Sequence, residues 1–203
     1  GLVVHTFDVD EPAGEKTFFM RKPVGGEMDV YSQARQAQLE TARRRFQSGD
    51  YSGTSRLLKK LEDELGESES NLSYQALELQ TKALTNCGSF DEALARTKAF
   101  VQRNPQMAEG YYLQAMVLHE KGLPLEAVDN LQAALSINSQ LHVASFMLAS
   151  FYLSTGEGEK AAGYLSRLSQ DLLKLAPETV LSFAEGTTAG ELLHIVKELA
   201  RKQ

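Results

Sequence analysis

Hydrophobic residues recur at every third or fourth position through most of the chain, which is the spacing of one face of an α-helix. These helical runs come in pairs, and a glycine separates the two members of a pair. In one pair, Gly122 stands between two apolar groups: Tyr111, Ala115 and Leu118 before it, and Ala127, Leu131, Ala134 and Leu135 after it. Glycine suits the left-handed backbone conformation that ends many helices. The pattern therefore predicts helical hairpins, each made of a helix, a tight turn and a second helix.

The hairpins recur with a fixed period. The turn glycines Gly88, Gly122 and Gly156 are 34 residues apart, and an alanine follows each of them by five residues, at Ala93, Ala127 and Ala161. A weaker copy has its glycine at Gly49, which lies 39 residues before Gly88. Unrelated hairpins would not keep two landmarks in phase across three copies, so we expect an array of about four repeats.

These landmarks resemble the tetratricopeptide repeat, a helical hairpin of this period with a small residue, an aromatic residue, a glycine, an alanine and a final proline at fixed places. The resemblance covers about residues 36 to 170. It is clearest in two units, at Gly88, Phe90, Ala93 and Pro105, and at Ala149, Tyr152, Gly156 and Ala161. Three residues depart from the pattern, namely Thr54, Pro124 and Gly158. The resemblance implies an all-α fold, a right-handed superhelix of about four hairpins over residues 30–175.

The two ends of the chain differ from the repeats. Residues 1–22 contain two short β-like runs, 2–10 and 17–20, separated by a turn signal, and they predict a β-hairpin. Residues 23–29 are expected to form a linker into the first helix, near Asp29. Residues 176–203 contain a further amphipathic helix from Glu191 onward, which we expect to cap the apolar end of the last repeat.

Taken together, these ends resemble the CheR-type methyltransferases. The hairpin running into residues 18–23 (Phe-Phe-Met-Arg-Lys-Pro) is similar to the last two strands of that enzyme, and residues 185–193 are similar to the segment that follows the repeats in some members. The resemblance implies a parent enzyme that transfers methyl from S-adenosylmethionine to chemoreceptor glutamates in bacterial chemosensory signalling. We expect its catalytic domain to be absent from this chain, and therefore no cofactor site here.

Charge and composition narrow the function classes. The chain has 21 Lys and Arg against 27 Asp and Glu, a net charge of −6, which disfavours nucleic acid and anionic membranes as partners. Its one cysteine, Cys87, excludes an internal disulfide and fits a reducing compartment, so we expect a cytoplasmic protein. No apolar run reaches the length needed to span a bilayer.

Residues with catalytic chemistry do not form a recognisable site. The histidines His5, His119, His142 and His194 lack metal-ligand spacing. Cys87 has no partner base nearby in sequence, and Arg43, Arg44 and Arg45 are best explained as a solvated helix face rather than an anion site. We therefore predict no catalytic, cofactor-binding or metal-binding residues.

The surface that binds a partner should be the concave groove, which the first helices of stacked hairpins line. Helical phase places seven candidate partner-binding residues there: Glu78, Lys82, Tyr112, Met116, His119, Phe146 and Ser150. Large apolar groups among them suit a peptide or helix ligand, unless the C-terminal helix or the N-terminal hairpin packs there instead. The carboxylate-clamp positions of chaperone-binding repeats hold Leu39, Arg43, Lys82, Tyr112 and Met116, a set that does not match a clamp.

The sequence thus predicts a protein–protein interaction module, the regulatory C-terminal part of a CheR-type enzyme. Its partner would be a chemoreceptor or the parent enzyme domain. The alternative is a general scaffold for a bacterial secretion, pilus or other assembly. A dimer formed by strand exchange through the N-terminal hairpin is a further expectation, because an isolated hairpin leaves strand edges unpaired.

Overall fold

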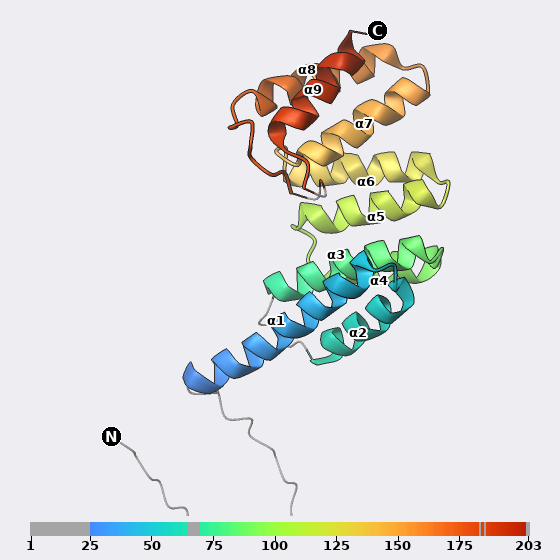
Figure 1. Ribbon diagram of the computed structural model, residues 1–203. Coiled ribbons are helices and arrows are strands. Elements are labelled where there is room, and N and C mark those ends of the chain that lie inside the picture. Colours follow the sequence, from blue (N-terminus) through green and yellow to red (C-terminus); the bar gives the residue numbers. More distant parts are fainter. Residues whose placement is uncertain (1–24, 65–69, 183, 185, 202–203) are drawn as a thin grey trace, which may run out of the picture.

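The computed structural model describes residues 25–64, 70–182, 184 and 186–201, and Figure 1 shows their arrangement. The described residues form nine helices that follow one another along a single stack. They are α1 (Gly25–Gln47), α2 (Tyr51–Glu64), α3 (Ser70–Asn86), α4 (Phe90–Arg103), α5 (Ala108–Glu120), α6 (Pro124–Ile137), α7 (His142–Ser154), α8 (Gly158–Leu172) and α9 (Ala189–Ala200). The first eight pair into four antiparallel hairpins, which confirms the predicted all-α hairpin array.

The repeat glycines occupy the turn inside each hairpin. Gly49, Gly88, Gly122 and Gly156 all have positive φ, between 73° and 83°. In every turn the residue after the glycine donates its N–H to a carbonyl five residues back, as Ser89 does to Leu84 at 2.9 Å. This bond is the mark of a Schellman helix end. A Cβ at these glycines would meet no atom within 4 Å, so the backbone conformation, not a lack of space, requires glycine.

Small buried residues let the paired helices approach each other. Ala93, Ala127 and Ala161 lie on the second helices and are at most 3% exposed. Thr54 takes this position in the first hairpin and is also fully buried. Its hydroxyl donates to the Asp50 carbonyl at 2.7 Å, so the extra polar group is satisfied and the departure from the repeat pattern leaves the hairpin intact.

Neighbouring hairpins pack through consecutive helices. Each second helix contacts the first helix of the next hairpin, as α2 does with α3 and α4 with α5. First helices also contact one another, α1 with α3 and α3 with α5. The side of the stack that the first helices share is therefore its inner side, as in other helical repeat arrays.

The C-terminal helix closes the array. Leu165, Leu168 and Leu172 of α8 share a buried cluster with Leu192 and Val196 of α9. These leucines would otherwise form an exposed apolar end, and burying a leucine is worth about 1.5–3 kcal/mol. α9 is therefore the cap that the sequence predicts.

Residues 186–191 build the start of this cap. Gly186 has a φ of 89°, and Thr188 and Glu191 form a reciprocal capping box at the start of α9. Gly190 lies against Pro177, whose carbonyl oxygen would be 3.1 Å from a Cβ at this position. These residues thus form the turn before α9 and stabilise the first turn of that helix.

The N-terminal predictions fall largely outside this description. The β-hairpin predicted for residues 1–22 lies outside the described residues and stays a prediction. α1 begins at Gly25, inside the segment 23–29 for which we expected a linker.

Candidate partner-binding groove

The seven candidate residues lie on three successive first helices, α3, α5 and α7. Glu78 and Lys82 of α3 form an ion pair at 3.1 Å, and their side chains are only 26% and 17% exposed. Next to them, the Arg43 guanidinium of α1 donates to the Gln75 side chain of α3 at 3.0 Å. This half of the inner side is therefore polar, and its charged groups are already engaged with one another.

The apolar candidates are more buried than helical phase suggested. Tyr112 is 7% exposed and belongs to the central core, where we had placed it on an open groove. Met116 is half-buried against the same core, and Phe146 is half-buried against the cluster that includes α9. Neighbouring hairpins, or the cap, cover these side chains, so their positions face the packed stack as well as the groove.

The remaining candidates form the accessible part of the surface. His119 is exposed near the end of α5, and Ser150 of α7 is half-buried. His119 lies on the same helical face as Tyr112 and Met116 by its spacing of seven and three residues. Their role in binding a partner stays a prediction.

The Tyr74 side chain of α3 has a perturbed pKa. Burial raises the pKa of Tyr74, and the carboxylates of Glu78 and Glu109 raise this pKa further. The Tyr74 ring also lies 6.2 Å from the Phe100 ring, centroid to centroid. Tyr74 is therefore a neutral phenol of α3 that packs against Phe100 of α4.

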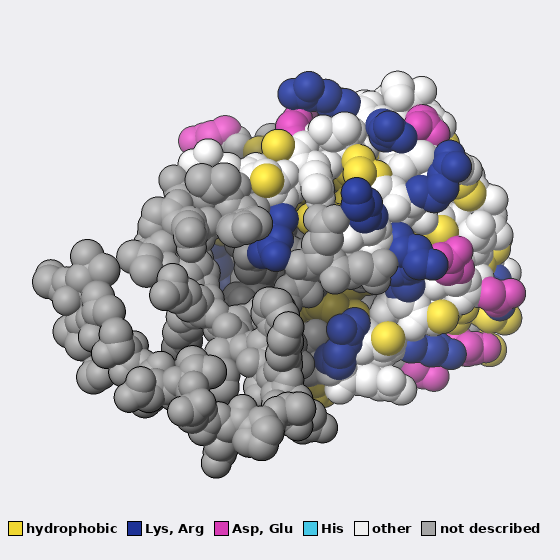
Figure 2. All heavy atoms as spheres, turned by 90° about the horizontal axis from the view of Figure 1, so that it is seen from below, with side chains coloured by type: hydrophobic (Ala, Val, Ile, Leu, Met, Phe, Trp, Pro, Cys, Tyr) yellow, Lys and Arg dark blue, Asp and Glu magenta, His cyan; other side chains and the backbone are white. Residues whose placement is uncertain are grey.

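The three consecutive arginines lie on a solvated helix face, as predicted. Figure 2 views the stack from the α1–α2 end, where Lys and Arg side chains are interspersed with Asp and Glu. Arg44 lies 3.8 Å from Glu40, and Arg45 lies 3.6 Å from Asp50. Since two of the three arginines have carboxylate partners of their own, they do not form a free anion site.

Groups with catalytic or metal-binding chemistry remain apart in the described ranges. Within residues 25–64, 70–182, 184 and 186–201, no group of three or more His, Cys, Asp or Glu side chains could hold a metal ion. Cys87 is exposed, and its sulfur lies 3.7 Å from the Ser52 hydroxyl. None of the helices that the structure describes has both the length and the hydrophobicity needed to cross a membrane.

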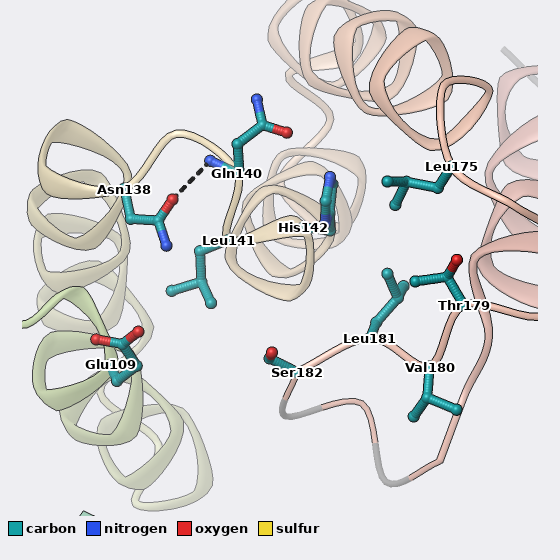
Figure 3. Close-up of a pocket in the computed structure, with 10 residues that line it drawn as sticks. All are labelled: Glu109, Asn138, Gln140, Leu141, His142, Leu175, Thr179, Val180, Leu181 and Ser182. Atoms are coloured by element: carbon teal, nitrogen blue, oxygen red, sulfur yellow. Dashed lines mark hydrogen bonds between the residues drawn. The ribbon is translucent and has the colours of Figure 1, made fainter. Parts of the chain in front are cut away.

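The structure also contains a pocket that the sequence does not predict. It has a volume of about 250 Å³ and lies near the starts of α5 and α7. Its walls come from Glu109, from residues 138–142 and from the irregular stretch 175–182, as Figure 3 shows. Burial lowers the pKa of His142 in this wall, and nearby Asp171 partly opposes that shift. No local pattern predicts the pocket, because the stretch that closes it has no helical periodicity.

Solved structures identify the architecture. A MamA crystal structure has a TM-score of 0.54 and 21% identity, over 84% of this chain and 86% of that one. TTC0263, a thermophilic TPR protein of Thermus thermophilus, has a TM-score of 0.54 and 18% identity, over 83% of this chain and all of its own. The chain has the tetratricopeptide-repeat fold.

A third structure gives the same result. MamA from Desulfovibrio magneticus has a TM-score of 0.55 and 15% identity, over 69% of this chain and 76% of that one. No protein-family model and no curated protein sequence matches the chain. At these identities the likeness concerns the fold alone.

Proposed function

We propose that the chain is a non-catalytic protein–protein interaction module that binds a partner segment along the inner side of its hairpin stack. The observation that carries this proposal is the inner surface itself, to which three successive first helices contribute. Its groups are varied in chemistry: the partly exposed Glu78–Lys82 pair, the exposed His119 imidazole and the half-buried Ser150 hydroxyl. An extended surface of this kind suits a polypeptide better than a small molecule.

Within that function, the partner would belong to bacterial chemosensory signalling. The support for this step is the resemblance of the two chain ends to CheR-type methyltransferases, which carry repeats of this fold after their catalytic domain. The module would bind a chemoreceptor or the parent enzyme and so govern which glutamates are methylated. S-adenosylmethionine would bind only to that separate catalytic domain, and the complex would be cytoplasmic.

The interaction function is tested by changing the charge of the groove. His119→Glu should reduce retention of native partners about tenfold, because it adds a charge to the most exposed part of the proposed interface. Leu125→Glu is the matched control, since Leu125 is 74% exposed on a second helix, away from the inner side. Quantitative pull-down from the source organism, with both variants and the unchanged chain, gives the comparison. Equal retention by all three proteins would refute groove binding.

The chemosensory step needs a separate experiment. Purified cytoplasmic fragments of chemoreceptors, and a CheR-type catalytic domain, are titrated into the chain in a calorimeter. Binding of either one, weakened by His119→Glu, is the expected result. If neither binds while His119→Glu still abolishes retention of other proteins, the general assembly scaffold replaces the chemosensory role. Measurable binding of S-adenosylmethionine to this chain would contradict the non-catalytic assignment.

A further inference from the structure

The pocket near the starts of α5 and α7 has the size and the shape of a side-chain site. Its volume of about 250 Å³ lies below the range of about 300–1,000 Å³ typical of small-molecule pockets. None of the seven groove candidates lines it. Figure 3 shows Glu109 and Leu141 on one side, with Leu181 and Val180 across the opening from them. Apolar walls with a few polar groups would suit one long side chain.

The pocket combines one carboxylate with neutral polar side chains, which come from Asn138, Gln140, His142, Thr179 and Ser182. Glu109 brings a carboxylate, which acts electrostatically on the Tyr74 phenol but has no ion pair or hydrogen bond within the described residues. The Nε2 atom of His142 is buried and, in the same part of the chain, has no hydrogen-bond partner. No lysine or arginine lines the pocket. A ligand that donates hydrogen bonds and carries positive charge, such as an ammonium or a guanidinium, would complement the carboxylate.

The rim of the pocket offers a main-chain contact as well. Val180 pairs with Thr188 in an isolated antiparallel bridge, and the flanking hydrogen bonds run from Leu181 to Thr187 and from Ala189 to Thr179. In this register the N–H and C=O of Val180 point away from Thr188. They have no hydrogen bond in the described ranges, and Val180 is 64% exposed. An extended polypeptide could therefore pair with Val180 at the edge of the pocket.

We propose that this pocket binds a Lys or Arg side chain of an extended partner segment, which lies along Val180. The aliphatic part of that side chain would contact Leu141 and Leu181, and its charged end would donate to the Glu109 carboxylate. Charge complementarity favours this occupant, because the pocket presents a carboxylate and no cation. The inference rests on the proposed interaction function and adds to it the chemistry of one contact.

The test uses the full chain and three short peptides, acetyl-Val-Thr-Arg-Thr-Val-amide and its forms with Gln or Glu in place of Arg. NMR titration of the ¹⁵N-labelled chain should show the arginine peptide shifting the amides of Glu109, His142 and Val180. The Glu peptide should bind at least about tenfold more weakly. Free arginine serves as a further probe, because it has the guanidinium but no peptide on either side.

Two variants isolate the carboxylate. Glu109→Gln keeps the size of the side chain and should weaken binding of the arginine peptide by about tenfold or more. Glu159→Gln is the matched control, since Glu159 is the second residue of α8 as Glu109 is the second residue of α5. It should change the affinity by less than about twofold.

Each other result overturns the proposal. Peptides that bind equally well to Glu109→Gln, or that show no preference for Arg over Glu, would exclude recognition of a cation by this pocket. Free arginine binding as tightly as the peptide would exclude the extended segment. Lack of any peptide binding at millimolar concentration would refute the proposed role of the pocket. It would leave the interaction function standing, because the His119→Glu comparison with native partners tests that function independently.

Discussion

Gly110 gives the most direct test of how the hairpins pack. It lies in the first turn of α5, and a Cβ at this position would be 2.9 Å from Phe100 Cδ1 and 3.0 Å from Val101 Cγ2 of α4. Phe100 is 5% exposed and lies in the central core, so it has little room to move. Gly110→Ala should therefore force the two hairpins apart.

The magnitude follows from two opposing effects. Alanine in a helix is favoured over glycine by up to about 1 kcal/mol. Crowding a packed core by one methyl group costs about 1–3 kcal/mol, so the net change at Gly110 is a loss of about 0–2 kcal/mol. Gly163 is the matched control, because it lies in α8, is exposed, and a Cβ there meets nothing within 4 Å. Gly163→Ala should gain about 0.5–1 kcal/mol.

Thermal and urea unfolding followed by circular dichroism measure the difference between the two variants. About 1–3 kcal/mol should separate them, with Gly110→Ala the less stable, and each kcal/mol corresponds to roughly 2–4 °C in a chain of this size. The same chemical change at two helical glycines makes the comparison independent of helix propensity to first order. If Gly110→Ala is as stable as Gly163→Ala, the close contact of α5 with α4 is refuted.

Three further predictions concern the turns and the cap. Gly122→Ala should cost about 1–2 kcal/mol in urea unfolding because φ is 83°, and Gly122→Asn should cost less. Thr188→Ala should lower the free energy of unfolding by about 1 kcal/mol through loss of the α9 cap. Hydrogen bonds from Thr188 lower the pKa of Glu191, so its stabilising effect is present above the unfolded pKa and is lost as pH falls through the lowered value. Glu191→Gln should therefore flatten the acid side of a stability–pH profile, and an unchanged profile would contradict this.

The sequence predicts the repeat well because each landmark has a local cause. A positive φ at Gly88 or Gly156 selects glycine, and a close approach between paired helices selects the buried alanines at Ala93 and Ala161. Both requirements recur in every hairpin, so both leave a periodic mark in the sequence. The sequence predicts the last helix from Glu191 onward, whereas the helix begins two residues earlier at Ala189, where Thr188 and Glu191 form its capping box.

The groove could not be placed as well, since exposure there depends on stacking. Helical phase assigns Tyr112 and Phe146 to the inner face, but it does not reveal how far neighbouring hairpins cover that face. Tyr112 is buried in the central core, while Phe146 meets the cluster that α9 completes. The periodicity of the sequence shows which face of its helix a side chain occupies. It does not show how close the neighbouring helices lie, because that distance is set only when the hairpins stack.

The pocket forms where the regular repeat ends, after the fourth hairpin. α5 begins at residue 108 and α7 at residue 142, so a regular array would begin the next first helix at 142 + 34 = 176. α9 begins at residue 189 instead, 13 residues later, and the irregular stretch in between folds against the start of α7. A regular helix would pair its own backbone groups, whereas this stretch leaves those of Val180 open at the rim of the pocket that Glu109 and His142 also line. The end of the periodic pattern is visible in the sequence, but the site that it creates exists only once residues 109, 142 and 180 have been brought together by folding.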